Sequence, residues 1–421
     1  MSELVTETVE EFRARAKAWI PANLNNVPPS IRSLRNELTD EQELEAVARE
    51  RAVQRKLFDA GFAGICIPRE YGGQGLTLAH QLAMREEMSG YEYPSRLQSP
   101  TFTPCTGVLM DFGTEEQKLR HIPAILKGEE IWMQFLSEPS GGSDVAGALT
   151  TAMRDGDEWV LNGSKIWTTG AWWSDWALCL ARTNWDVQKH RGLTVFMLPL
   201  HQPGIEVHRI EMLNGNREFC QEFMTDVRVP DADRIGGVDD GWTVGTRWMF
   251  HERMMFNSPY TMIPTGSGFG PSVGTSLVKI AQDAGRGDDP AALELIGESH
   301  MLGHVRHALE GRIGDGVRGK TMSDQSSAVG RLFSSMVVTR TTTITLELVG
   351  PFAGVWSDED GTVTDAGTDF LMRQAGSIGG GTTEMARNVV SERVLGMPRE
   401  MSMDRDVAFS AVPRNRSSRS S

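Results

Sequence analysis

The segment that decides the fold is QFLSEPSGGSDV, which spans residues 134–145. Its first residues suit the end of a β-strand, and the Ser and Gly residues that follow suit a tight turn. A turn of small residues exposes backbone N–H groups and lets a flat ligand approach the chain closely. The same composition also occurs in ordinary Gly- and Ser-rich loops, so the rest of the chain has to decide between these interpretations.

The sequence pattern around this segment changes twice along the chain, from one typical of helices to one typical of strands and back to one typical of helices. The Glu-, Ala-, Arg- and Leu-rich stretch from Thr39 to Phe58 is typical of a helix. Short runs such as KIWTT (residues 165–169) are typical of an antiparallel β-barrel or sandwich, and Asn162-Gly163 predicts a hairpin between two of them. We therefore expect an N-terminal α-helical domain, a central β-domain, a C-terminal α-helical bundle and a flexible tail, over residues 1–131, 132–237, 238–400 and 401–421 respectively.

Composition narrows the classes of function. The 421 residues suggest two or three domains, and the net charge of −14 argues against nucleic acid as the main partner. The four cysteines form no CxxC pair, so no metal site and no disulfide framework is indicated. The N-terminus lacks the pattern of a signal peptide, and no apolar run approaches the roughly 20 residues that span a bilayer. We therefore expect a cytoplasmic protein without a membrane partner.

Four motifs in order resemble one enzyme family. Residues 134–145 are similar to the "TEPxxGSD" signature of acyl-CoA dehydrogenases. KIWTT (165–169) is similar to the second flavin segment of the family, and GTEEQK (113–118) is similar to its N-terminal helical signature. GGGTTEMARN (379–388), followed by ERVLG (392–396), is similar to its C-terminal signature. The resemblance covers roughly residues 40–400. It implies an N-terminal α-domain, a central β-domain and a C-terminal four-helix bundle, in agreement with the texture of the chain.

The resemblance also implies a cofactor, a substrate and roles for residues. FAD would accept a β-hydride at flavin N5 while a glutamate removes the α-proton of an acyl-CoA thioester, and an electron-transfer flavoprotein would take the electrons. Trp167 and Thr169 would line the isoalloxazine ring, although Trp167 could instead be a core tryptophan. The other implied contacts to FAD or the thioester within the chain are Gln134, Leu136, Ser137, Ser143, Thr382 and Glu384, with Ser143 also in the substrate site.

The position of the catalytic base is unusual. Many members carry the glutamate just before the Gly-Thr pair of the C-terminal signature, where this chain has Gly380, a position we assign to the substrate site. A minority carry it on the first long helix of the C-terminal domain, where this chain has Glu252 followed by Arg253. The resemblance thus implies that Glu252 is the base and that Arg253 lies near the CoA moiety. The alternative is that Glu252 is a solvated helix-surface acid in an i,i+4 pair.

One stretch and one further position depart from the family pattern. Many homotetrameric members have an Arg-Lys-x-Phe-Gly motif that reaches the FAD of a neighbouring subunit, whereas this chain has AGRGDDP at residues 284–290. Arg286 is the arginine available there, and Glu347 stands where a glutamine is often found, so both are candidate FAD contacts. We expect a homodimer or homotetramer. A heteromer in which each chain supplies part of one site remains an alternative.

Three functions fit these motifs. The leading one is dehydrogenation of an acyl-CoA with electron-transfer flavoprotein as the acceptor. A relative on the same fold that reacts with oxygen, such as an acyl-CoA oxidase or a nitroalkane oxidase, is the second. The third is a non-catalytic partner subunit of a heteromeric acyl-CoA dehydrogenase, against which Glu252 argues. The sequence carries no signal for the length or type of the acyl chain.

Overall fold

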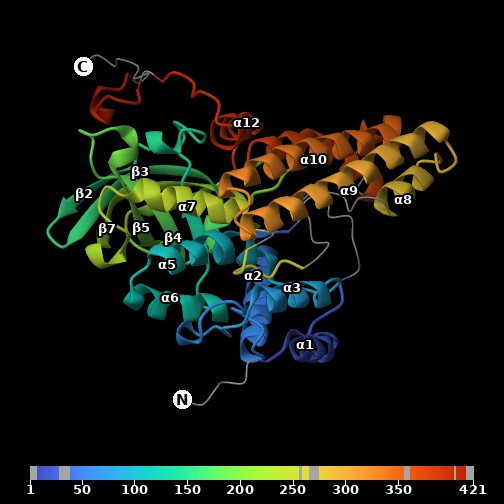
Figure 1. Cartoon of the computed structure of the whole chain (residues 1–421), viewed down its shortest axis with the longest axis horizontal. Helices are drawn as coiled ribbons and strands as arrows, with labels where there is room; N and C mark the ends of the chain where they lie inside the picture. The colour runs from blue at the N-terminus through green and yellow to red at the C-terminus, as the bar shows by residue number, and fades with distance from the viewer. Residues whose placement is uncertain are drawn as a thin grey trace.

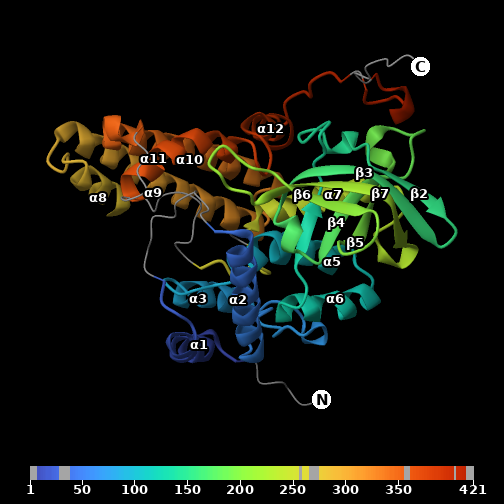
Figure 2. The same ribbon diagram turned by 180° about the vertical axis from the view of Figure 1, so that it is seen from behind.

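The fold follows the predicted order of helices, strands and helices. The computed structural model describes residues 7–27, 38–255, 258–264, 275–354, 361–402 and 404–413. Figures 1 and 2 show the N-terminal helices below the sheet and long C-terminal helices that extend away from the sheet. The predicted fold class is confirmed in this three-part layout. Of the predicted flexible tail, residues 401–421, the last part, 414–421, lies outside the described residues.

The N-terminal helices begin where the sequence places capping threonines. The side chains of Thr39 and Thr114 each accept a hydrogen bond from the backbone N–H three residues later. The residue at that later position is a glutamine, whose side chain accepts a hydrogen bond from the backbone N–H of the threonine. The segment from Gln98 to Cys105 forms a π-helical turn that leads into α5. The helices of this part are α1 (Val9–Asn23), α2 (Asp40–Asp59), α3 (Leu78–Glu87), α4 (Ser95–Leu97), α5 (Thr106–Phe112) and α6 (Glu115–Lys127).

The central sheet is open and mixed, whereas the prediction was an antiparallel barrel or sandwich. Its hydrogen-bonded order is β6-β7-β3-β2-β4-β5-β8, with β1 paired to β4, and the described strands do not close this path into a ring. The pairs β1–β4 and β2–β4 are parallel, because the chain makes long excursions between these strands. The strands are β1 (Trp132–Phe135), β2 (Thr151–Asp155), β3 (Glu158–Thr169), β4 (Trp176–Arg182), β5 (Leu193–Pro199), β6 (Ile205–Arg209), β7 (Phe219–Pro230) and β8 (Arg234–Ile235).

The hairpin predicted at Asn162-Gly163 is wrong. Strand β3 continues through these residues, and the turn between β2 and β3 lies earlier, between Asp155 and Glu158. The Asn162 side chain donates to Asp226 on β7, and the pairing with β7 shifts register between Leu161 and Gly163. A side chain at Gly163 would overlap Thr150, since its Cβ would stand 2.5 Å from the Thr150 hydroxyl. The glycine therefore serves a bulge and a close approach within a strand.

The C-terminal part is mainly helical in its described residues. Helices α8, α9 and α11 all contact α10, and both views show them side by side. The threonines of α10 do not interrupt it, because hydroxyls such as that of Thr342 donate to the carbonyl one turn earlier. In the part of the chain that the structure describes, no helix is long and apolar enough to cross a membrane. The helices are α7 (Gly241–Arg253), α8 (Thr275–Asp283), α9 (Pro290–Arg318), α10 (Ser327–Val349), α11 (Gly361–Met372) and α12 (Thr383–Val389).

Candidate active site

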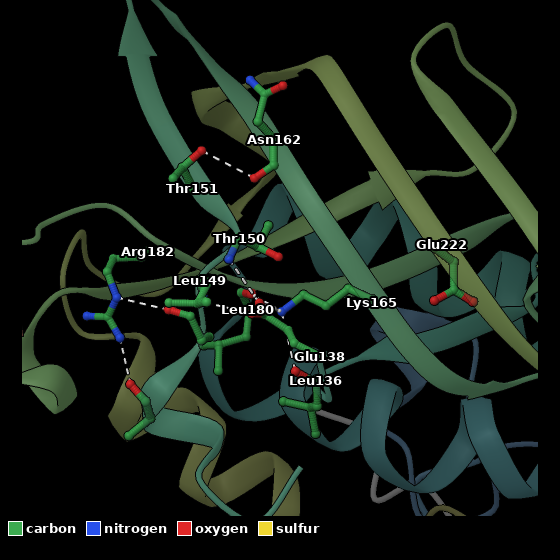
Figure 3. Close-up of polar contacts among 12 residues, drawn as sticks. Leu136, Glu138, Leu149, Thr150, Thr151, Asn162, Lys165, Leu180, Arg182 and Glu222 are labelled. Atoms are coloured by element: carbon green, nitrogen blue, oxygen red, sulfur yellow. Dashed lines mark hydrogen bonds and ion pairs between the residues drawn. The ribbon is translucent and has the colours of Figure 1, made fainter. Parts of the chain in front are cut away.

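A buried lysine joins the two segments that resemble flavin-binding motifs. Lys165 on β3 is fully buried, and its Nζ donates to Glu138 Oε1 at 2.8 Å, to the Leu180 carbonyl at 2.7 Å and to the Leu136 carbonyl at 3.3 Å (Figure 3). The Glu138 carboxylate also accepts from the backbone N–H groups of Leu149 and Thr150. Every charge in this group is therefore paired and hydrogen-bonded, as a buried ion pair requires. The pair fixes residues 136–150 against β3.

Trp167 is turned out of the sheet by a second irregularity of β3. The register with β7 shifts between Ile166 and Thr168, and Trp167 has a φ of 66°, which is rare for a bulky residue. As a result Thr168 points inward, while Trp167 is 56% exposed. An exposed indole held in a strained backbone conformation is typical of a binding surface. Trp167 is thus not a core tryptophan.

The loop after β1 presents small side chains next to this indole-bearing strand. The Ser137 carbonyl accepts from the Ile166 N–H at 3.0 Å, which joins the loop to β3 directly. Ser143 and Thr169 are exposed, whereas Leu136 and Ser137 are half-buried. A Cβ built on Gly141 or Gly142 would meet no atom closer than 3.7 Å, so the surface of this loop is open.

Helix α7 is anchored to the sheet and to the N-terminal part at the same time. Trp248 is fully buried, and its Nε1 donates to Gln134 Oε1 at 2.5 Å, so the side chain of Gln134 binds α7. His251 packs against Gly107 and pairs with Asp111, which also accepts from Arg247. These contacts turn the neighbouring residue, Glu252, toward the C-terminal part.

Glu252 and Gly380 lie side by side. A Cβ built on Gly380 would stand 3.7 Å from Glu252 Oε1 and 3.8 Å from the Nε of Arg331 on α10. Glu252 is half-buried, and within the described residues its carboxylate has no hydrogen bond and no direct ion pair. Its side chain thus occupies the neighbourhood that a side chain at position 380 would use, and it is not a solvated acid of the helix surface.

Burial and two cations set the charge of this carboxylate. Burial raises the pKa of Glu252 above its ordinary value, and the guanidinium groups of Arg253 and Arg331 oppose that rise. Burial likewise lowers the pKa of both arginines, and Glu252 opposes this. A carboxylate with a raised pKa and no hydrogen-bonded partner among the described residues is suited to accept a proton from a bound molecule.

The remaining predicted residues lie in two other places of the C-terminal part. The Arg286 guanidinium donates to the Glu347 carbonyl at 2.7 Å, and neither residue bonds to residues 134–169 among the described residues. Helix α8, which leads to Arg286, lies at the end of the bundle remote from the sheet in both views. Thr382 caps α12 through the Met385 N–H, and Glu384 is exposed in its first turn.

Matches to family models decide which family this is. A model of the acyl-CoA dehydrogenase N-terminal domain matches residues 6–129, and a model of the acyl-CoA dehydrogenase middle domain matches residues 134–227. The chain belongs to the acyl-CoA dehydrogenase family. Members of this family are flavin-dependent oxidoreductases, so the predicted family and enzyme class are confirmed.

Relatives match this acyl-CoA dehydrogenase over nearly its whole length. Acyl-CoA dehydrogenase IpdE1 from Mycobacterium tuberculosis is 32% identical over 94% of this chain and 99% of its own. The solved structure titled Tcur3481-Tcur3483 steroid ACAD is 25% identical with a TM-score of 0.70, over 93% of this chain and 98% of that chain. The ChsE4-ChsE5 complex from Mycobacterium tuberculosis, 23% identical with a TM-score of 0.70 over 95% and 100%, shares the fold.

The surface of this acyl-CoA dehydrogenase fits a flat aromatic cofactor. Trp167 offers an exposed indole, and the open Gly141-Gly142 turn leaves room for close approach. Lys165, from the buried face of β3, holds the loop after β1 at a fixed distance from β3. The sequence motifs identified both segments but gave Lys165, Glu138 and Arg331 no role. For Lys165 a signal was available, since it shares the inward parity of Trp159 and Leu161 along β3.

Proposed function

We propose that this chain catalyses the FAD-dependent α,β-dehydrogenation of an acyl-CoA thioester, with Glu252 as the base. The observation that carries the proposal is the unpaired, half-buried carboxylate of Glu252 beside Gly380. The α-proton passes to Glu252, and the C–H electron pair forms the new Cα–Cβ double bond as the β-hydrogen leaves with its electrons. FAD, when bound, supplies the acceptor for that hydride and passes the electrons on to an electron-transfer flavoprotein.

The residues that would hold the isoalloxazine ring of FAD lie on the two segments that Lys165 joins. Trp167 and Thr169 would face the isoalloxazine ring, and Leu136, Ser137 and Ser143 would contact the ring or the thioester. Gln134 would act through its backbone, because its side chain already binds Trp248. Thr382 and Glu384 would contact the cofactor near its pyrophosphate, and Arg253 would lie near the CoA moiety. Binding by such fixed groups orients the reacting carbon atoms without further ordering.

Assembly into an oligomer is part of the proposal. Leu293, Met301 and Val305 recur at helical spacing on α9 and are 51%, 50% and 45% exposed. Apolar side chains gathered on one helix face are typical of a subunit interface. Arg286 and Glu347 would then reach the FAD of an adjacent chain. Two of the similar solved structures, Tcur3481-Tcur3483 steroid ACAD and the ChsE4-ChsE5 complex, carry paired names, which supports testing for a second, different chain as well as a second copy.

The visible spectrum of the purified protein tests the cofactor and the reaction together. We expect a yellow protein with non-covalent FAD, whose absorbance bleaches when an acyl-CoA from a panel is added without oxygen. A colourless protein that cannot be reconstituted with FAD, alone or with a partner chain, contradicts the proposal. Bleached protein that recovers rapidly in air, without electron-transfer flavoprotein, identifies an oxidase instead. Sedimentation of the yellow protein measures assembly, and an active monomer contradicts the oligomer.

A further inference from the structure

We propose that Arg331 is a positioning residue of this site, which holds the loop of residues 376–380 beside Glu252 and keeps the Glu252 carboxylate in the anionic form that accepts the α-proton. The inference rests on the proposed function and deepens it. Arg331 belongs to none of the four sequence motifs that pointed to that function.

The first part of the argument is the contact between Arg331 and the loop. Its Nη2 donates to the Gly376 carbonyl at 2.9 Å and also to the Gly379 carbonyl. These two carbonyls precede Gly380, which has a φ of 68° and lies beside Glu252. One guanidinium from α10 therefore fixes the backbone that faces the carboxylate. It also limits how far that loop can move toward or away from α7.

The second part of the argument is that the charged groups of Arg331, Glu252 and Arg253 all have atoms without hydrogen-bonded partners among the described residues. Arg331 uses Nη2 for the loop, and within the described part of the chain its Nε and Nη1 bind no other protein group. Glu252 and Arg253 likewise have no hydrogen-bonded partner among the described residues. Half-buried charges without partners are costly to keep, so they are typical of a site completed by a ligand. Arg331 and Glu252 thus both border the position that a side chain at Gly380 would take.

The third part is the set of charged and titratable groups that face Glu252. Arg253 comes from α7 itself, Arg331 comes from α10, and the Cys105 thiol comes from the π-helical turn. Burial and the nearby Glu252 both raise the pKa of Cys105, so this thiol stays neutral. The loop beside Glu252 adds only backbone at Gly379 and Gly380. The two arginines are therefore the groups that oppose the effect of burial on Glu252.

The sign of the effect follows from these charges. Because the cation of Arg331 lowers the pKa of Glu252, its removal should raise that pKa. A general base works in its deprotonated form, so the acid limb of the pH profile for flavin reduction should move to higher pH. A nearby unit charge typically shifts a pKa by about one unit or more. Arg331→Gln should therefore react about tenfold more slowly than the parent on that limb.

The experiment measures anaerobic flavin reduction by a reactive acyl-CoA across pH for the FAD-loaded oligomer and three variants. Arg331→Gln removes the charge, whereas Arg331→Lys keeps the charge but cannot reproduce the fork of N–H donors. Arg318→Gln is the matched control, because Arg318 is an exposed arginine of the bundle whose ion-pair partner is Asp315. We expect a raised midpoint for Arg331→Gln only, and a lower FAD content for both variants at position 331.

The outcomes separate this inference from the function on which it rests. An unchanged midpoint in Arg331→Gln, with a parent that is reduced normally, overturns the role of Arg331 alone. A parent that no acyl-CoA reduces contradicts the proposed function instead. If Arg331→Gln does not retain FAD, Arg331→Met is measured with FAD in excess. The same upward shift is required of it, and an unshifted profile overturns the inference.

Discussion

Lys165 in the sheet and Glu252 at the end of α7 differ in how their charges are satisfied. Lys165 is fully buried, and its three N–H groups reach one carboxylate and two carbonyls. Glu252 is only half-buried, yet it has no hydrogen bond among the described residues. Two arginines lie near it, but neither of these described residues forms an ion pair with it. The first arrangement leaves no hydrogen bond of these charges unmade, whereas the second leaves hydrogen bonds that a ligand could supply. Unmade hydrogen bonds of a charged side chain therefore indicate a functional site better than its depth of burial does.

The largest effect on stability should come from breaking the buried ion pair between Lys165 and Glu138. Lys165→Met leaves the Glu138 carboxylate buried without its cation, which should cost about 3–5 kcal/mol of unfolding free energy. The loop after β1 should also lose its fixed position, so FAD should bind more weakly. Chemical denaturation followed by fluorescence, together with FAD titration, measures both. Parental stability in Lys165→Met would show that the ion pair does not fix the loop.

A smaller, pH-dependent effect should come from Glu222 on β7. This residue is fully buried and accepts from Thr168 at one oxygen, while its other oxygen has no partner among the described residues. Burial raises its pKa to about 8. The raised pKa means that its contribution to stability is present at low pH and is lost as pH rises toward 8, by up to about 1.4 kcal/mol per pH unit. Glu222→Gln should therefore gain stability relative to the parent between pH 5 and pH 8. Parallel curves for the two proteins over that range would refute the assignment.

Restoring a carboxylate at position 380 should partly compensate for removing Glu252. In Glu252→Gln, the variant Gly380→Glu places an acid beside the vacated site, since the Cβ would stand 3.7 Å from the original carboxylate. The φ of 68° at this position should cost about 1–2 kcal/mol for any residue with a Cβ. We expect at least a tenfold gain in flavin reduction over Glu252→Gln, measured at saturating substrate. Gly380→Gln is the control, and an equal gain in that variant would remove the argument.

The smallest effect should come from an exposed ion pair. Arg228 on β7 pairs with Asp155 and Glu158, and all three side chains are largely exposed. Arg228→Ala should change the unfolding free energy by less than about 1 kcal/mol, because water already solvates these charges. The same denaturation experiment measures it beside Lys165→Met. A loss as large as that of Lys165→Met would mean that burial does not distinguish the two pairs.

The sequence predicted the order of the three parts because the motifs and the local texture agree. It misjudged the sheet, since parallel pairing between β1 and β4 depends on the path of the intervening loops and leaves no local pattern. Asn162-Gly163 has the composition of a hairpin, but the tertiary contacts to Thr150 and Asp226 placed it inside β3. Local turn chemistry was overruled there by packing.

The candidate site was predictable as far as the motifs extend. Glu252 and Gly380 were both named from the sequence, and the structure brings them together from segments more than a hundred residues apart. Arg331 could not be found in this way, because nothing in the sequence of α10 indicates which neighbour its guanidinium meets. The role of Arg286 stays a prediction, since the structure describes one chain and the expected contact crosses to another.

The most direct test of the account is the rate of flavin reduction in Glu252→Gln. Glutamine keeps the size of the side chain but cannot accept the α-proton. The account predicts that this variant still binds FAD and acyl-CoA, while anaerobic stopped-flow shows reduction slowed by roughly 10²–10⁴-fold. Its unfolding free energy should not fall, because no hydrogen bond of Glu252 is lost among the described residues. Reduction at the parental rate would contradict the account and place the base on another carboxylate or on a partner chain.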